Sequence, residues 1–312
     1  DPLLDISGEA VYLRDEKTGI YWSPTPQPAK DDSPYVTRHG QGYSVFEHSS
    51  KGIKQQTTIY VPLDKSIKII KLKLTNITNS TRQLSAYYYL EWVLGVNREQ
   101  NAPYLVTESQ ENIIFCRNVY QEEFFGRVAF ICTFGESYKS FTCDRQDFIG
   151  VNRTLKNPLS LDKEKLSGKT GNGIDPCAVV QVEVGLGPIE EKTIYFLIGD
   201  EENKDSALSL AKAFSSERKL TESYQEVLDY WDNLLSTIQI STPEKSFDIL
   251  FNRWLVYQTL GCRIWARSAF YQSGGAIGYR DQLQDVMSLS VLRPEITRKQ
   301  IILHSSRQFP EG

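Results

Sequence analysis

The sequence predicts an antiparallel β-sandwich followed by an α-helical region, and three observations carry this prediction. Up to about residue 200, short strand-like segments are separated by clusters of Gly, Pro and Asn. Beyond that point, the apolar residues recur at spacings of three and four, which is typical of helices. A Thr-Pro break at 242–243 then divides the helical region. We therefore expect a sandwich over residues 1–203, a helical linker over 204–242, and an incomplete α domain over 243–312.

The clearest strand signal is the segment 67–75, in which apolar and basic residues largely alternate. This pattern is typical of a strand with one face buried and one face in solvent. A tyrosine-rich segment, 83–93, follows after turn residues. The remaining expected strands lie at 113–116, 128–132, 178–184 and 193–198.

Helical periodicity begins with the apolar residues of segment 206–220 and continues from Tyr224 to Leu235. After the break, an aromatic-rich helix is expected from Phe247 to Leu260. The last two expected helices cover 281–292 and 294–307. About 70 residues after Pro243 are too few to close a helical barrel, so we expect the α domain to be incomplete.

The composition excludes several classes of function. The 312 residues are 40% hydrophobic and 24% charged, which is ordinary for a globular chain and excludes wholesale disorder. With 39 acidic and 35 basic side chains, the net charge of −4 predicts no nucleic-acid partner. No apolar run approaches the roughly 18 residues of a spanning helix, so this stretch is expected not to insert into a membrane.

The chain ends and the cysteines suggest a context. The first residue is Asp1 and the only methionine is Met287, so we expect the chain to be part of a longer protein. Five cysteines without a CxxC pair favour free thiols in a reducing compartment, and hence the cytoplasm. Three histidines without metal-ligand spacing predict no metal site.

Two short motifs are set aside. Gly168-Lys169-Thr170 lacks the leading glycine of a phosphate-binding loop. Asn76-Ile77-Thr78 and two further sequences match the glycosylation pattern, which matters only in a secreted eukaryotic chain.

The most informative stretch is 274–285, where three glycines precede an Arg-Asp pair that opens a helix. In one interpretation, Asp281 is the N-cap, with Gln284 three residues later as in a capping box. In the other, Arg280 and Asp281 project into a pocket and hold sugar hydroxyl groups through charge-assisted hydrogen bonds. The spacing favours neither interpretation, and both can hold at once.

Two other regions remain open at this point. Upstream aromatic and arginine residues could line a carbohydrate subsite or, as we favour, pack in a core. Trp22 and His39 in the sandwich could pack or could reach a ligand. The upstream residues are Arg263, Trp265, Arg267, Phe270 and Tyr271.

Six segments in order resemble glycoside hydrolase family 94, the inverting β-glucoside phosphorylases. The resemblance runs over essentially the whole chain, and the last segment is the most specific. The nearest branch is the phosphorylase-like module of bacterial cyclic β-1,2-glucan synthases. The segments are Trp-Ser-Pro-Thr at 22–25, Arg-His-Gly-Gln-Gly-Tyr at 38–43, Glu-Trp-Val-Leu-Gly at 91–95, Asp-Pro-Cys-Ala at 175–178, Trp-Ala-Arg-Ser-Ala-Phe-Tyr-Gln at 265–272 and Gly-Tyr-Arg-Asp-Gln-Leu-Gln-Asp at 278–285.

The resemblance implies a super-β-sandwich, a helical linker and the start of an (α/α)6 catalytic barrel, usually in a homodimer. It implies that Arg280 and Asp281, with Gln284 on the same helix, bind the glucosyl unit, and that Arg267 binds phosphate. Cellobiose phosphorylases carry a further sugar-binding arginine six residues before the aspartate. Gly275 stands there in this chain, which argues for a longer or differently linked glucan.

By this resemblance, the reaction joins a β-linked gluco-oligosaccharide and inorganic phosphate to give α-glucose 1-phosphate, without a cofactor. Phosphate already carries negative charge, so only one general acid is needed. In the family that acid is an Asp in a Gly-Asp-Trp-Asn-Asp segment, which this chain lacks, so it is expected beyond Gly312 and the chain alone is expected to be inactive. The alternative function is a non-catalytic module that binds carbohydrate or organises a dimer within a larger synthase, which could tether it to the inner membrane.

Overall fold

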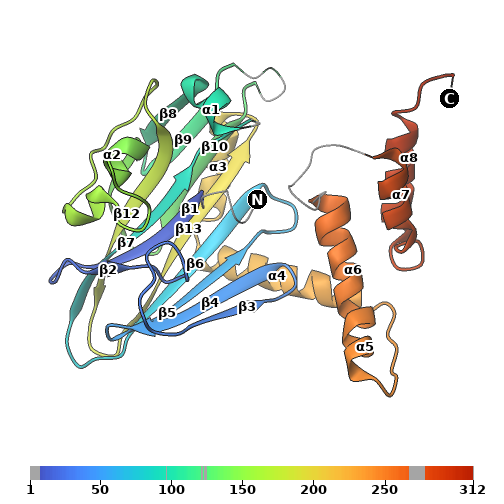
Figure 1. Cartoon of the computed structure of the whole chain (residues 1–312), viewed down its shortest axis with the longest axis horizontal. Coiled ribbons are helices and arrows are strands. Elements are labelled where there is room, and N and C mark those ends of the chain that lie inside the picture. The colour runs from blue at the N-terminus through green and yellow to red at the C-terminus, as the bar shows by residue number, and fades with distance from the viewer. Residues whose placement is uncertain (1–7, 96, 121, 123–124, 267–277, 312) are drawn as a thin grey trace. The chain divides into compact units, whose positions relative to one another are not determined.

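The computed structural model describes residues 8–95, 97–120, 122, 125–266 and 278–311 (Figure 1). The chain divides into two compact units, one ending at Val227 and one beginning at Leu228. The first contains all the strands of the described residues, and the second is helical. The finer division at 203 and 242 stays a prediction.

Two antiparallel sheets form the first unit, as the sequence predicts, and each of the six expected strands is present. The five-stranded sheet has the order β11 (Ser137–Asp144), β12 (Pro176–Leu186), β7 (Arg82–Glu91), β1 (Glu9–Asp15) and β2 (Tyr21–Trp22). The eight-stranded sheet has the order β3 (Tyr35–His39), β4 (Tyr43–Ser50), β5 (Ile53–Tyr60), β6 (Ile67–Asn76), β13 (Glu191–Glu201), β10 (Val128–Phe134), β9 (Ile113–Asn118) and β8 (Leu105–Gln110).

The core lies between the sheets, and the side-chain alternation of each strand explains how it is filled. On β6, Ile70, Leu72 and Leu74 enter the core, while the lysines between them face away. The tyrosine-rich β7 is buried on both faces, because Tyr88 enters this core and Tyr87 and Tyr89 enter a second one. That second core is closed by residues of the segment from α2 (Arg145–Ile149) through η3 (Leu159–Asp162).

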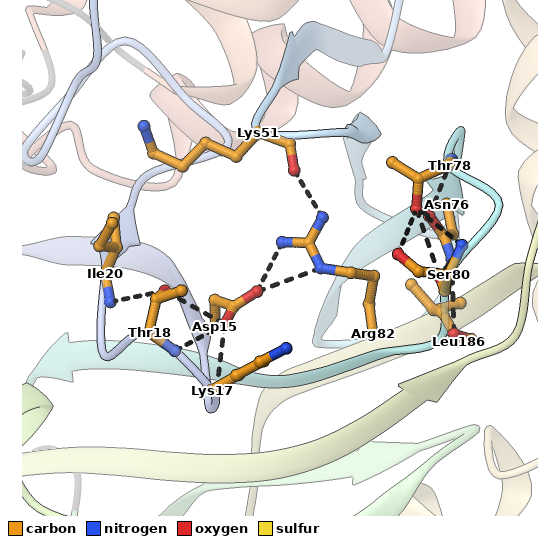
Figure 2. A network of polar contacts seen from close by, with 10 residues as sticks. All are labelled: Asp15, Lys17, Thr18, Ile20, Lys51, Asn76, Thr78, Ser80, Arg82 and Leu186. Carbon is orange, nitrogen blue, oxygen red and sulfur yellow. Dashed lines mark hydrogen bonds and ion pairs between the residues drawn. The ribbon is translucent and has the colours of Figure 1, made fainter.

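A buried ion pair ties the two sheets together at one edge (Figure 2). Asp15, at the end of β1, accepts hydrogen bonds from the backbone N–H groups of Lys17 and Thr18 at 3.0 and 2.9 Å. Arg82 donates to the Asp15 carboxylate through Nε at 3.1 Å and Nη2 at 2.5 Å. Its other nitrogen, Nη1, donates to the carbonyl of Lys51 between β4 and β5 at 2.6 Å. One guanidinium therefore joins a strand end of one sheet to a turn of the other.

Asn76 forms a second buried polar centre in Figure 2. Its side chain is completely buried; the amide nitrogen donates to the carbonyls of Ser80 at 2.8 Å and Gly187 at 2.7 Å. The amide oxygen accepts from the Thr78 backbone N–H at 3.0 Å. Because this amide is enclosed and fully engaged, the match to a glycosylation sequence at 76–78 has a structural role.

The helices follow the strands, with one interruption that the sequence analysis did not predict. The apolar run at 206–220 is broken after Phe214, where the Ser216 hydroxyl accepts from the Lys219 N–H at 3.3 Å and starts a new helix. Two stretches of the second unit are π-helical. The helices that follow the last strand, in both units, are α3 (Lys204–Ala213), α4 (Glu217–Leu235), α5 (Lys245–Ile249), η4 (Leu250–Trp254), α6 (Leu255–Gln258), η5 (Thr259–Trp265), α7 (Tyr279–Met287) and α8 (Pro294–Ser305).

Small helices α1 (Arg98–Asn101) and η1 (Ala102–Tyr104) connect β7 to β8 in the sandwich. Among the helices that the structure describes, none is both long enough and apolar enough to cross a lipid bilayer.

Candidate functional site

Three of the four expected site residues lie together on helix α7. Arg280 and Asp281 occupy its first turn, and Gln284 follows one turn later on the same exposed side. Their side chains make no hydrogen bond or ion pair with another residue of the described part of the chain. The fourth residue, Arg267, lies outside the described residues.

The start of α7 differs from one sequence-based interpretation. In that interpretation Asp281 is the N-cap, but the structure has Gly278 as the N-cap, with extended φ and ψ of −78° and 119°, and Asp281 as the third helical residue. The Asp281 carboxylate folds back so far that a Cβ atom on Gly278 would lie 2.8 Å from Oδ2. A side chain at position 278 would thus require the exposed Asp281 carboxylate to move. The capping interpretation is wrong, and the exposed Asp281 oxygens lie at the positive end of the helix dipole.

The opposite side of α7 packs on α8 and fixes the helix. His304, which is 1% exposed, places Nδ1 3.0 Å from the Tyr279 carbonyl oxygen. A carbonyl can only accept, so Nδ1 carries the proton, and Nε2 accepts from the Gln300 amide at 2.8 Å. Val286 is buried on the same side. These contacts fix α7 from one side, and its other side is exposed among the described residues.

A third contact joins α7 to the helix before it. Arg263 Nε donates to Asp285 Oδ2 at 2.8 Å, and Arg263 is in the π-helical segment η5. Asp285 is therefore engaged in an ion pair, whereas Asp281, one turn earlier, is available.

The aromatic residues upstream of α7 pack on one another. Trp265 lies 5.4 Å from the ring of the buried Trp231 and 6.2 Å from Tyr230, measured between centroids. Burial raises the pKa of the Tyr230 hydroxyl, with a smaller opposing effect of Arg293. Trp265 thus contacts other aromatic rings but is itself 51% exposed, so it is not the core residue that the favoured interpretation expects. Phe270 and Tyr271 lie outside the described residues.

The open question about Trp22 in the sandwich is also answered. Trp22 is 1% exposed and its Nε1 donates to Gln55 Oε1 at 3.0 Å, so it is a packing residue. His39 is exposed, and its Nδ1 lies 2.9 Å from the Ser44 hydroxyl.

All five cysteines are free thiols. Cys116, Cys132, Cys143 and Cys177 are buried and Cys262 is half-buried. Burial raises the pKa of Cys132 to about 12, so this thiol stays protonated and packs as an apolar group.

Comparison with protein families assigns both units. Residues 1–217 match the supersandwich domain of glycosyl hydrolase 94, and residues 230–312 match the catalytic domain of the same superfamily. The chain belongs to glycoside hydrolase family 94. It is a phosphorylase-like module of that family, in which α7 falls within the catalytic-domain match and only part of that domain is present.

Individual relatives agree with this assignment. The chain is 32% identical over 316 residues to the cyclic β-(1,2)-glucan synthase NdvB of Rhizobium meliloti, covering all of this chain and 11% of that protein. It is 28% identical to an N,N′-diacetylchitobiose phosphorylase of Vibrio proteolyticus and 25% identical to a solabiose phosphorylase of Paenibacillus borealis, covering 96% of this chain in each. The chain spans 38% and 39% of those two phosphorylases.

Proposed function

We propose that this family 94 module is the amino-terminal part of an inverting phosphorylase that acts on a β-linked gluco-oligosaccharide, with β-1,2 as the expected linkage. The observation that supports this most is the exposed side of α7, where Arg280, Asp281 and Gln284 lie together without partners in the described part of the chain. This helix belongs to the region matched by the family's catalytic domain.

In the proposed reaction, a phosphate oxygen attacks the anomeric carbon from the side opposite the glycosidic bond. The bond from that carbon to the leaving sugar breaks, a general acid protonates the leaving oxygen, and α-glucose 1-phosphate is formed with inverted configuration. We assign the acid to an aspartate beyond Gly312. Inorganic phosphate is the co-substrate, with no further cofactor and no metal.

The residues of α7 have binding roles in this proposal. The Asp281 carboxylate accepts hydrogen bonds from glucosyl hydroxyl groups, and the Arg280 guanidinium donates to them. Gln284 can do both, one turn along the helix. Arg267 is assigned to phosphate, because a guanidinium matches two phosphate oxygens at once.

The proposal extends to the domains and the assembly. It assigns residues 1–203 to the sandwich, 204–242 to the linker and 243–312 to the first helices of an (α/α)6 barrel. It places a homodimer in the cytoplasm, within a longer protein that can be tethered to the inner membrane. The 312-residue chain alone is expected to be inactive, because the acid is not in it.

The test is phosphate-dependent release of glucose 1-phosphate by the longer parent protein from β-1,2-, β-1,3- and β-1,4-linked gluco-oligosaccharides. We expect release from one linkage by the parent and none by residues 1–312 alone. Release from no linkage would contradict the proposed reaction, and release by residues 1–312 would contradict the assignment of the acid.

A further inference from the structure

A groove of about 480 Å³ lies on the eight-stranded sheet, on the face that points away from the sandwich core. Ile70 and Leu72 enter the core, so Lys71 between them faces the groove. Thr58, Lys71 and Tyr195 are cross-strand neighbours on three adjacent strands, so their side chains form a row on this face of the sheet. Every lining residue belongs to the unit that ends at Val227. The volume is in the range of ligand pockets.

One wall of the groove is built from three tyrosines. The buried Tyr60 on β5 donates its hydroxyl to the Leu220 carbonyl at 2.6 Å, which fixes the start of α4 on this face. Tyr224 of α4 packs edge-on against Tyr43 of β4, with ring centroids 5.6 Å apart and planes at 78°. Tyr43 and Tyr224 are only half-buried, so ring surface of both remains accessible from the groove.

The floor of the groove is polar and mixed in character. Gln56 donates to Glu47 Oε1 at 3.1 Å, and Glu47 also forms an ion pair with Arg38 on the edge strand β3. The Lys71 ammonium lies 5.9 Å from the centroid of the Tyr195 ring and contacts no carboxylate of the described residues. The groove therefore offers hydrogen-bond donors, an acceptor and aromatic surface within one volume.

The Arg-His-Gly-Gln-Gly-Tyr segment at 38–43, which α7 leaves unexplained, forms the turn at the edge of this groove. The Gly40 N–H donates to the Tyr43 carbonyl at 2.9 Å, and a Cβ atom on Gly40 would lie 2.2 Å from the Tyr43 ring. Any side chain at position 40 would thus push the Tyr43 ring away. Tyr43 and Arg38 thus both lie at the turn end of the hairpin, on either side of this glycine.

From these features, we propose that the groove binds a neutral gluco-oligosaccharide. A sugar ring has an apolar face for Tyr43 and Tyr224, and hydroxyl groups that both donate and accept for Lys71, Gln56 and Glu47. Glu47 is already paired with Arg38, so the Lys71 ammonium is left to donate to a sugar hydroxyl group. The site is built by the sandwich and the start of α4, so it does not depend on phosphorolysis or on α7.

Binding to the 312-residue chain tests this site, measured by calorimetry without phosphate. The probes are β-1,2-linked and β-1,4-linked glucotetraose, with inorganic phosphate in a separate titration. Because no turnover is involved, the result is independent of the glucose 1-phosphate assay.

Two variants and two matched controls complete the experiment. Tyr224→Ala removes ring surface and Lys71→Met removes the ammonium, and each is expected to weaken binding about tenfold. Lys73→Met changes the next outward lysine of β6, which is paired with Glu191, and Tyr120→Ala changes a tyrosine that stacks on Tyr104 elsewhere in the sandwich. Both controls are expected to stay within about twofold of wild type.

Tyr224→Ala also removes packing within the protein, so the melting temperature of each variant is measured beside its binding affinity. Lys71 is on the solvent side of the sheet, so Lys71→Met is the variant that tests the binding contact without disturbing the core. Saturable tetraose binding that Lys71→Met weakens, with an unchanged melting temperature, would support the site. No saturable binding of either tetraose, or equal losses in the controls, would overturn it. If inorganic phosphate binds through Lys71 and neither tetraose binds, the proposal is overturned as well.

Discussion

The unit ending at Val227 and the unit beginning at Leu228 enclose their apolar side chains to very different extents. In the first, large residues such as Tyr12, Tyr87 and Phe196 are completely buried, and the five-stranded sheet is covered on both faces. In the second, Met287 is 68% exposed and Val291 is 73% exposed. Other large apolar side chains of this unit that are at least 40% exposed are Phe247, Ile249, Leu250, Phe251, Trp254, Leu255, Trp265, Tyr279, Ile301, Ile302 and Phe309.

This difference indicates that the two units have different roles, one in stabilising the chain and one in exposing the candidate binding residues. The sandwich has the enclosed core that a self-standing domain needs, whereas the apolar surface of the helical unit has little cover within the described residues. We infer that stability of the chain resides mainly in the sandwich. The helical unit holds α7 in place through local contacts with α8, and Arg280, Asp281 and Gln284 are exposed on the other side of α7 among the described residues.

The first prediction tests this comparison with the largest expected effect, by the same Leu→Ala substitution in each of the two units. Leu72 is completely buried in the sandwich core, and Leu255 on α6 is 48% exposed. Leu72→Ala is expected to lower the free energy of unfolding by about 2–5 kcal/mol, because it leaves a cavity. Leu255→Ala is expected to cost less than about 1 kcal/mol. Denaturant unfolding of the 312-residue chain measures both, and equal costs would refute the distinction.

The second prediction tests the polar tie between the sheets. The side chains of Arg82 and Asp15 are 17% and 6% exposed, and Arg82→Met leaves the Asp15 carboxylate and the Lys51 carbonyl without this partner. We expect a loss of about 2–4 kcal/mol. Arg153→Met is the control, since its ion pair with Asp162 is 35% and 50% exposed and is expected to contribute less than about 1 kcal/mol. Similar losses in the two variants would argue against a special role for Arg82.

The third and smallest expected effect is a pH dependence of the chain's stability, which comes from the ion pair of Arg82 and Asp15. Burial opposes ionisation of Asp15, but hydrogen bonds from Arg82 and Thr18 outweigh it and lower the pKa of this carboxyl. A lowered pKa contributes stability that is present above the unfolded-state value of about 3.9 and is lost as the pH falls through the folded-state value.

Thermal melting of the wild type and Asp15→Asn between pH 7 and pH 2 measures this contribution. The wild type is expected to have the higher melting temperature at neutral pH. The difference in melting temperature between the wild type and Asp15→Asn should narrow as the solution is acidified below about pH 4. Asp205→Asn on the exposed side of α3 is the control and should run parallel to the wild type. A gap that stays constant with pH would mean that the Asp15 charge is not the cause.

The sequence predicted the fold where one physical signal dominates. The alternation in β6 shows directly which face is buried, because lysines occupy the other. Strands β3 and β4 were not predicted, since most of their residues are exposed or half-exposed and carry no alternation that a single sequence reveals. The helix break after Phe214 was missed for a related reason: the apolar spacing continues across it, and only the Ser216 cap marks it.

The placement of the candidate site residues on one helix was predicted in part, and their binding roles stay a prediction. The Arg-Asp pair was found because three glycines before a helix are unusual, and the structure places Arg280, Asp281 and Gln284 on one side of α7. The start of the helix was misplaced because aspartate and glycine are both good N-caps, and only the backbone at Gly278 distinguishes them. The groove at Lys71 was missed because its residues come from five strands and a helix, and their register is a tertiary property.

One measurement tests most directly the claim that α7 displays binding residues without carrying stability. Phosphorolysis and thermal melting would be followed on the same preparations of the parent protein, with Asp281→Asn beside Glu295→Gln, an exposed acid on α8. We expect kcat/KM for Asp281→Asn to fall by roughly 100-fold with an unchanged melting temperature, since charged hydrogen bonds to substrate are lost, and Glu295→Gln to match the wild type. Full activity in Asp281→Asn, or a loss that follows a lowered melting temperature, would contradict the account.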